Sequence, residues 1–152
     1  MPTVENQKKI QYLSRYQKLG KRIEQLRDDR ALWLSRACRT TQAIADMPRA
    51  ARGIRGNSLE LEQYMEISEE ITRELRNLRR LRREIRAVIA ALEDDTLQAL
   101  MLYRYINGMT FEQIAVKLQY SWRQVCRKHG RALQELKLPR EEPVEPAREK
   151  AS

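Results

Sequence analysis

The sequence contains few residues that interrupt helices. Five glycines and five prolines occur among its 152 residues, and three of the prolines lie beyond residue 138. Proline removes a backbone donor and glycine loosens the chain, so both residues tend to end or kink helices. Their scarcity before residue 138 predicts long uninterrupted helices, and we expect an all-α fold.

Patterns that carry catalysis or metal binding are also missing. His129 is the only histidine, and Cys38 and Cys126 are isolated thiols without the spacing of a metal or disulfide motif. The sequence has no metalloprotease, serine-hydrolase, phosphate-loop or dinucleotide-binding motif. We therefore expect no enzymatic activity, no cofactor and no metal site, with His129 as a partly buried imidazole on an apolar helix face.

Long apolar segments are absent as well. No stretch approaches the ~20 apolar residues needed to cross a bilayer, and the first residues lack the apolar core of a signal peptide. Lys and Arg number 30 against 21 Asp and Glu, which gives a net charge of +9. This surplus favours a polyanionic partner, nucleic acid ahead of an anionic membrane. We expect a cytoplasmic protein without membrane contact.

Two long amphipathic helices are predicted over residues 1–93. From Val4 to about Asp46, apolar residues recur at spacings of three and four, namely Tyr12, Tyr16, Leu19, Ile23, Leu26, Trp33 and Ala37. Gly20, inside this stripe, predicts the close approach of another helix. A second helix, capped by Asn57 and running to about Leu92, repeats its apolar residues every seven positions, at Ile71, Leu78, Ile85 and Leu92.

The break between these helices is the segment Met47–Asn57, which contains a proline and two glycines. Two apolar stripes joined by a short break predict a long antiparallel, coiled-coil-like hairpin. We expect it to serve oligomerisation or partner binding. A homodimer through the hairpin would cover apolar surface that a single thin hairpin leaves exposed.

An arginine-rich stretch lies within the second helix. Seven arginines occur from Arg73 to Arg86, against two acidic residues. One interpretation is a basic face that lies along DNA phosphates. The other is an exposed helix face whose arginines pair with acids of the first helix, such as Glu24, Asp28 and Asp29. The two interpretations are compatible, because the arginines outnumber the local acids.

Residues 94–138 are predicted to form a three-helix unit. Asp95, with Gln98 three residues on, can cap a helix from Thr96 to Ile106. Gly108 supplies a left-handed residue that ends this helix. The remaining residues, 139–152, contain three prolines and several charges with almost no apolar side chains, which predicts a disordered tail.

The last two helices of this unit form a helix-turn-helix pattern. Thr110 with Gln113, and Ser121 with Gln124, are two capping boxes eleven residues apart. The small Ala115 suits a point where the two helices cross closely. A short helix, a tight turn and a longer helix are typical of DNA-binding motifs.

The predicted face for DNA lies on the second helix of the motif. Val125, His129, Ala132 and Leu136 fall on one side. The residues that we expect to contact DNA lie largely elsewhere, namely Ser121, Trp122, Arg123, Gln124, Arg127, Lys128 and Arg131. Arg can bind guanine edges bidentately, Gln can do the same at adenine, and the remaining cations can neutralise phosphates. The alternative is a solvated basic helix.

Two stretches carry a family resemblance. LYRYINGMTFEQIA, at residues 102–115, resembles the start of sigma-70 region 4, in which a stretch of the LRYINGLTWEEIA type leads into a helix-turn-helix. YSWRQVCRKHGRAL, at residues 120–133, is similar to small prophage-encoded proteins related to the ArpU/RinA-type phage transcriptional regulators, which have a long helical N-terminus. The resemblance is close over residues 97–136 and looser over residues 12–92.

The resemblance has one departure, in the turn of the motif. Sigma-like turns usually have Gly or Asn there because the backbone is left-handed. Gln119 stands at this position, and a left-handed Gln would cost ~1 kcal/mol. The substitution therefore predicts a turn of a different shape.

What the resemblance implies is a prophage-encoded transcription regulator of the bacterial nucleoid that binds double-stranded DNA sequence-specifically. RNA polymerase is a second partner in sigma factors, and the sequence leaves open whether this chain contacts it. Two alternatives stay open. One is a DNA-packaging recognition subunit of the small-terminase kind, and the other is a structural helical adaptor with a degenerate helix-turn-helix.

Overall fold

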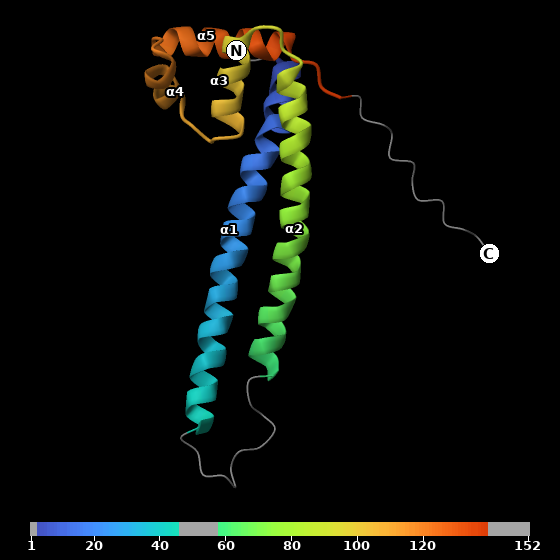
Figure 1. The fold of residues 1–152 in the computed structure, drawn as a ribbon, viewed down its shortest axis with the longest axis vertical. Coiled ribbons are helices and arrows are strands. Elements are labelled where there is room, and N and C mark those ends of the chain that lie inside the picture. Colours follow the sequence, from blue (N-terminus) through green and yellow to red (C-terminus); the bar gives the residue numbers. More distant parts are fainter. Residues whose placement is uncertain (1–2, 46–57, 140–152) are drawn as a thin grey trace, which may run out of the picture. The chain divides into compact units, whose positions relative to one another are not determined.

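The computed structural model describes residues 3–45 and 58–139, and this part of the chain is all-helical (Figure 1). The helices are α1 (Val4–Ala45), α2 (Ser58–Ala90), α3 (Asp95–Tyr105), α4 (Phe111–Leu118) and α5 (Trp122–Glu135). The prediction of an all-α fold is confirmed. The Met47–Asn57 break with its Asn57 cap, and the tail from residue 140 on, lie outside the described residues. No described helix is long and apolar enough to cross a membrane.

The chain divides into two compact units. One is Ser14–Glu84, which we call the hairpin unit; the other combines Met1–Leu13 with Ile85–Ser152, and we call it the α3–α5 unit. The sequence placed the division at residue 93, whereas residues 85–93 and the first turns of α1 lie in the α3–α5 unit. These helix ends supply core side chains, because Leu13, Ile85 and Ile89 are fully buried.

Within the hairpin unit, α1 and α2 lie side by side and antiparallel (Figure 1). Arg22 Nη2 lies 3.3 Å from Glu70 Oε1, and Arg15 Nη2 lies 3.7 Å from Glu84 Oε2. A lower number on α1 therefore pairs with a higher number on α2. Both pairs are largely exposed to solvent, so they contribute little to stability. They do show the register in which α1 and α2 lie.

The apolar stripes of the hairpin meet as predicted. Ile23 of α1 is buried with Ile67 and Ile71 of α2, and partly buried residues pack around them, namely Leu19, Leu26, Trp33, Leu75 and Leu78. Gly20 departs from its prediction. A Cβ built on Gly20 would meet no atom within 4 Å, so no helix approaches closely there and the expectation is wrong.

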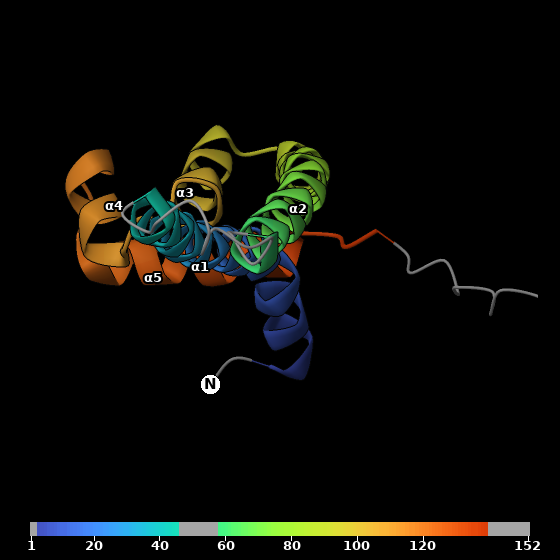
Figure 2. The ribbon, with the colours of Figure 1, turned by 90° about the horizontal axis from the view of Figure 1, so that it is seen from below.

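The α3–α5 unit is built around α5. Helices α3 and α4 both lie against it, and they also touch one another (Figures 1 and 2). The buried core of these three helices consists of Leu97, Leu100, Met101, Tyr105, Ile114, Ala115, Val125, Ala132 and Leu133. The start of α1 is tied to the end of α5, because the Lys9 ammonium donates to the Leu133 carbonyl at 2.7 Å. A cation suits the negative end of a helix.

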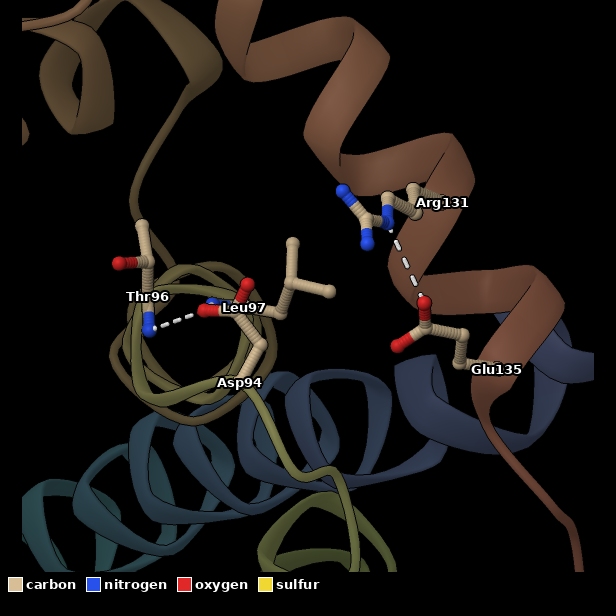
Figure 3. A network of polar contacts seen from close by, with 5 residues as sticks. All are labelled: Asp94, Thr96, Leu97, Arg131 and Glu135. Atoms are coloured by element: carbon tan, nitrogen blue, oxygen red, sulfur yellow. Dashed lines mark hydrogen bonds and ion pairs between the residues drawn. The ribbon is translucent and has the colours of Figure 1, made fainter.

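The N-cap of α3 is one residue earlier than predicted (Figure 3). Asp94 has an extended backbone, and its Oδ1 accepts from the backbone N–H of Thr96 at 2.8 Å and of Leu97 at 3.3 Å. Asp95 is instead the first helical residue. Gln98 does not complete a capping box, since its amide donates to the carbonyls of Leu92 and Ala90 at the end of α2.

Candidate nucleic-acid interface

The turn between α4 and α5 has a defined backbone geometry. Gln119 adopts φ 60° and ψ 40°, the left-handed conformation. Its N–H donates to the Val116 carbonyl at 3.4 Å, and the Tyr120 N–H donates to the Ala115 carbonyl at 3.0 Å. This pair of bonds is the Schellman arrangement that closes a helix end. The prediction that Gln119 would give a turn of another shape is therefore wrong: the two bonds hold Gln in the conformation that Gly or Asn adopts more readily.

Both predicted capping boxes are present. Thr110 Oγ1 accepts from the Gln113 N–H at 3.2 Å, and Gln113 Oε1 accepts from the Thr110 N–H at 3.0 Å. Ser121 and Gln124 make the same reciprocal bonds, at 3.2 and 2.9 Å. Each box satisfies helix N-terminal donors that would otherwise lack a partner. The first residues of α4 and α5 are therefore fixed, and so is the connection between the two helices.

A cluster of rings joins α3 and α4 to the inner face of α5. His129 Nε2 lies 2.6 Å from Tyr105 Oη, and the Phe111 ring meets the imidazole edge-on at a centroid distance of 5.0 Å. The guanidinium of Arg104 lies 4.4 Å from the Phe111 ring centroid and donates to the Met109 carbonyl at 3.1 Å. Arg104 thereby links the end of α3 to the residues that lead into α4.

Burial shifts the ionisation of both polar members of this cluster. Burial and, to a smaller extent, the Arg104 charge lower the pKa of His129 to about 4. Burial raises the pKa of Tyr105 to about 12, against the opposing effect of Arg104. Both groups are therefore neutral at pH 7, as expected for hydrogen-bonded groups away from water. The prediction of His129 as a satisfied, partly buried imidazole is confirmed.

The outer face of α5 carries two unpaired arginines. Arg123 and Arg127 are four residues apart, so they lie on one side of the helix, and both are exposed. Neither forms an ion pair with any described residue. No described residue therefore occupies the donors of their guanidinium groups.

The other predicted polar residues already have contacts within the chain. The side-chain oxygen of Gln124 accepts from the Ser121 N–H in the capping box. A bidentate contact to adenine would need that oxygen as well as the side-chain nitrogen. Arg131 Nε lies 3.2 Å from Glu135 Oε1 (Figure 3). The Lys128 ammonium lies 5.0 Å from the Tyr120 ring centroid. All of these residues therefore lie on α5 or at its N-cap. Arg123 and Arg127 differ from the other polar residues because they make no such contact with a described residue.

Apolar exposure adds a second feature near the start of α5. Trp122, the first residue of the helix, has 53% of its surface exposed, and Val116 of α4 has 81% exposed. Trp122 is among the residues predicted to contact DNA, whereas Val116 is not, because it lies off the predicted apolar side of α4. Contiguous patches of exposed apolar side chains mark surfaces that contact a partner, whereas single ones are common on protein surfaces.

Gln134 and Gly130 also lie on α5, and neither was among the residues predicted from the sequence. Gln134 is exposed and follows Arg127 by seven residues, which places it on the same outer face. The spacing of seven residues can be seen in the sequence, but a single glutamine near the end of the helix does not by itself indicate a contact with DNA. Gly130 lies between the basic residues, and a Cβ added there would meet no atom within 4 Å. In the described ranges, no cluster of His, Cys, Asp and Glu is arranged to hold a metal ion.

Comparison with known proteins places this unit in a family. A family model described as "Protein of unknown function (DUF1492)" matches residues 59–137, slightly more than half of the chain. The matched stretch contains α3, α4 and α5 together with nearly all of α2. No curated protein and no solved structure matches the chain.

Proposed function

The chain belongs to the DUF1492 family of unknown function, and we propose that this member is a transcription regulator that binds double-stranded DNA sequence-specifically through α5. The major groove admits an α-helix, and side chains near the start of such a helix reach base edges. Cytoplasmic, nucleoid-associated localisation and a prophage origin belong to the same proposal, as does RNA polymerase as a further partner.

The observation that carries the proposal is the state of Arg123 and Arg127. Both are exposed and without an ion pair among the described residues, on a helix whose start is fixed by the Ser121–Gln124 capping box. A helix-turn-helix needs this combination, because the connecting turn sets the angle of the second helix and the free cations supply the contacts. The resemblance of residues 102–115 to sigma-70 region 4 supports the same conclusion.

The contacts divide between bases and phosphates. Arg123 and Arg127 lie in the first half of α5, where a recognition helix enters the groove most deeply. Lys128 and Arg131 follow and are assigned to phosphates. Arg131 would exchange its exposed partner Glu135 for a phosphate at little cost, because exposed ion pairs contribute ~0–1 kcal/mol.

The proposal is tested by selecting bound fragments from host and phage genomes and then measuring variants on the selected site. Arg127→Ala should weaken specific binding by about 1–3 kcal/mol and relax the preference at one base pair. Arg131→Ala should weaken specific and random DNA about equally and lower the salt slope by about one unit. Fluorescence anisotropy over several salt concentrations measures both quantities.

Glu135→Gln provides a matched control at the same end of the helix. It removes the carboxylate that holds Arg131 and one negative charge, so binding to any duplex should become tighter. If Arg127→Ala and Arg131→Ala both remain folded by circular dichroism and bind the selected site with wild-type affinity and salt slope, α5 is not the DNA-reading surface.

A further inference from the structure

The arginine-rich stretch of α2 presents a continuous exposed row. Arg73, Arg76, Arg80 and Arg83 recur at spacings of three, four and three, so they follow one another along one side of the helix, and all four are exposed. Ile71, on the opposite side, is buried against α1. The packing of the hairpin therefore uses the apolar stripe and leaves the arginine row facing solvent.

The antiparallel register explains why these charges have few partners. Arg22 pairs with Glu70 and Arg15 pairs with Glu84, so the α1 segment level with the row at residues 73–83 is approximately residues 12–22. This segment contains Arg15, Lys18, Lys21 and Arg22, and α1 has no acidic residue between Glu5 and Glu24. The α1 segment level with the row therefore supplies no acid that could pair with these arginines.

The register also contradicts the other interpretation of the stretch, in which its arginines pair with acids of α1. Asp28 and Asp29 lie beyond Arg22 on α1, level with α2 residues that precede Glu70, and neither they nor Glu24 forms an ion pair with an arginine of residues 73–84 in the described structure. Among the described residues, the one polar contact of the row is internal to α2, between Arg80 Nη2 and Asn77 Oδ1 at 3.2 Å. No described residue therefore neutralises the charge of the row.

From this we infer that the row Arg73–Arg76–Arg80–Arg83 is a second nucleic-acid surface, which binds the phosphate backbone of double-stranded DNA without reading its sequence. At 1.5 Å per residue the row extends roughly 15 Å, comparable with several successive phosphates of one strand. Arginine suits this role because its planar group bonds phosphate oxygens in pairs. The inference goes beyond the proposed function of α5 and does not depend on it.

The composition of the surface favours a duplex over other polyanions. Single strands are held by aromatic side chains on which bases stack, and no aromatic residue occurs between Tyr64 and Tyr103. A membrane-binding helix inserts an apolar face beside its basic one, but Ile71 and Ile67 on the apolar face are buried in the hairpin. A rigid row of cations without either feature fits the regular backbone of a duplex.

The test compares two double variants of the full chain that remove equal charge. Arg76→Gln/Arg83→Gln removes two members of the row. Arg27→Gln/Arg39→Gln removes two exposed arginines from α1 outside the segment opposite the row. Glutamine has nearly the helix propensity of arginine, so both proteins should show wild-type circular dichroism. Binding is measured against a labelled random-sequence duplex, and against a single-stranded oligonucleotide and phosphatidylserine vesicles, over a range of salt.

The row variant should lose about two units of salt slope on the duplex, close to 0.9 for each phosphate contact, while the α1 variant keeps the wild-type slope. Equal losses in the two variants would overturn the inference, because only net charge would then matter. A loss confined to the single strand or the vesicles would overturn it in favour of that partner. If Arg127→Ala keeps wild-type sequence preference while the row variant loses its slope, the proposed function fails and this inference stands.

Discussion

Tyr105 Oη lies 2.6 Å from His129 Nε2, and this hydrogen bond joins α3 to the inner face of α5. The two rings also stack, at a centroid distance of 5.8 Å, and Phe111 of α4 meets the imidazole from its edge. One side chain on α5 thus contacts both other helices of the three-helix arrangement. The position of the outer face of α5 depends on this inner contact.

The first prediction concerns the effect of pH on this contact. The pKa of His129 is lowered from 6.5 to about 4 by burial and, secondarily, by Arg104. Between these values the unfolded chain binds a proton that the folded protein does not, so the free energy of unfolding should be highest above pH 6.5 and fall as the pH is lowered toward 4. Urea unfolding at a series of pH values measures this.

The control is His129→Gln, which removes the titrating group. Carboxylates also titrate near pH 4, but they are common to both proteins and cancel in the difference. The difference in stability between wild type and His129→Gln should therefore shrink as the pH falls from 6.5. A difference that does not change with pH would show that His129 has the same pKa in the folded and the unfolded protein, which would contradict the prediction.

The second prediction concerns the left-handed residue Gln119. Gly adopts this conformation without steric cost, whereas another residue pays roughly 1–2 kcal/mol. Part of the gain is lost to the greater freedom of Gly in the unfolded chain, so Gln119→Gly should stabilise the protein by roughly 0.5–1 kcal/mol. Gln25→Gly, in the middle of α1, should instead destabilise it by about 1 kcal/mol. Denaturant unfolding of the two variants should move in opposite directions, and a shared direction would contradict the prediction.

The third prediction concerns the capping box at the start of α5. Ser121→Ala should cost roughly 1 kcal/mol, because the Gln124 N–H loses its acceptor. Gln124→Ala should also destabilise the protein, because the side-chain oxygen of Gln124 accepts from the Ser121 N–H. Ser35→Ala, at an exposed position within α1, should not destabilise. Thermal unfolding of the single variants and of the double variant should show that the two losses are coupled, and strictly additive losses would mean that the reciprocal bonds do not act together.

Local signals in the sequence predicted the helices and most of their ends. Thr110 and Ser121 cap α4 and α5 as expected, because a capping box involves residues only three positions apart. The apolar stripes also predicted the hairpin core around Ile23 and Ile71. These features depend on neighbours along the chain, and the chain alone specifies them.

Features that depend on distant contacts were not predictable in the same way. The cap of α3 is Asp94 instead of Asp95 because Gln98 bonds the end of α2 and is unavailable for a box. Lys9 reaches a carbonyl 124 residues away, and no periodicity indicates that the start of α1 belongs with α5. In each case a polar group could serve two partners, and only the fold decides between them.

The last prediction uses Gly130, which has no packing role within the described chain. Glycine inside a helix costs about 0.8–1 kcal/mol relative to alanine, and a Cβ at Gly130 or at Gly20 would meet nothing within 4 Å. Gly130→Ala and Gly20→Ala should therefore each stabilise the protein, raising the melting temperature by about 2–4 °C. The two variants form a matched pair, because the same methyl group is added to open space on α5 and on α1.

The two variants should differ in their affinity for duplex DNA. Gly130 lies between Arg127 and Arg131, on the helix that we propose enters the major groove, and a methyl group there would crowd any surface that approaches closely. Gly130→Ala should weaken duplex binding by about 1 kcal/mol, at the lower end of the cost of overpacking. Gly20→Ala should leave binding unchanged, since Gly20 lies on α1 and belongs neither to α5 nor to the arginine row of α2. Anisotropy titrations of both variants on the same duplex measure the difference, and tighter or unaltered binding by Gly130→Ala would mean that DNA does not approach α5 at this residue.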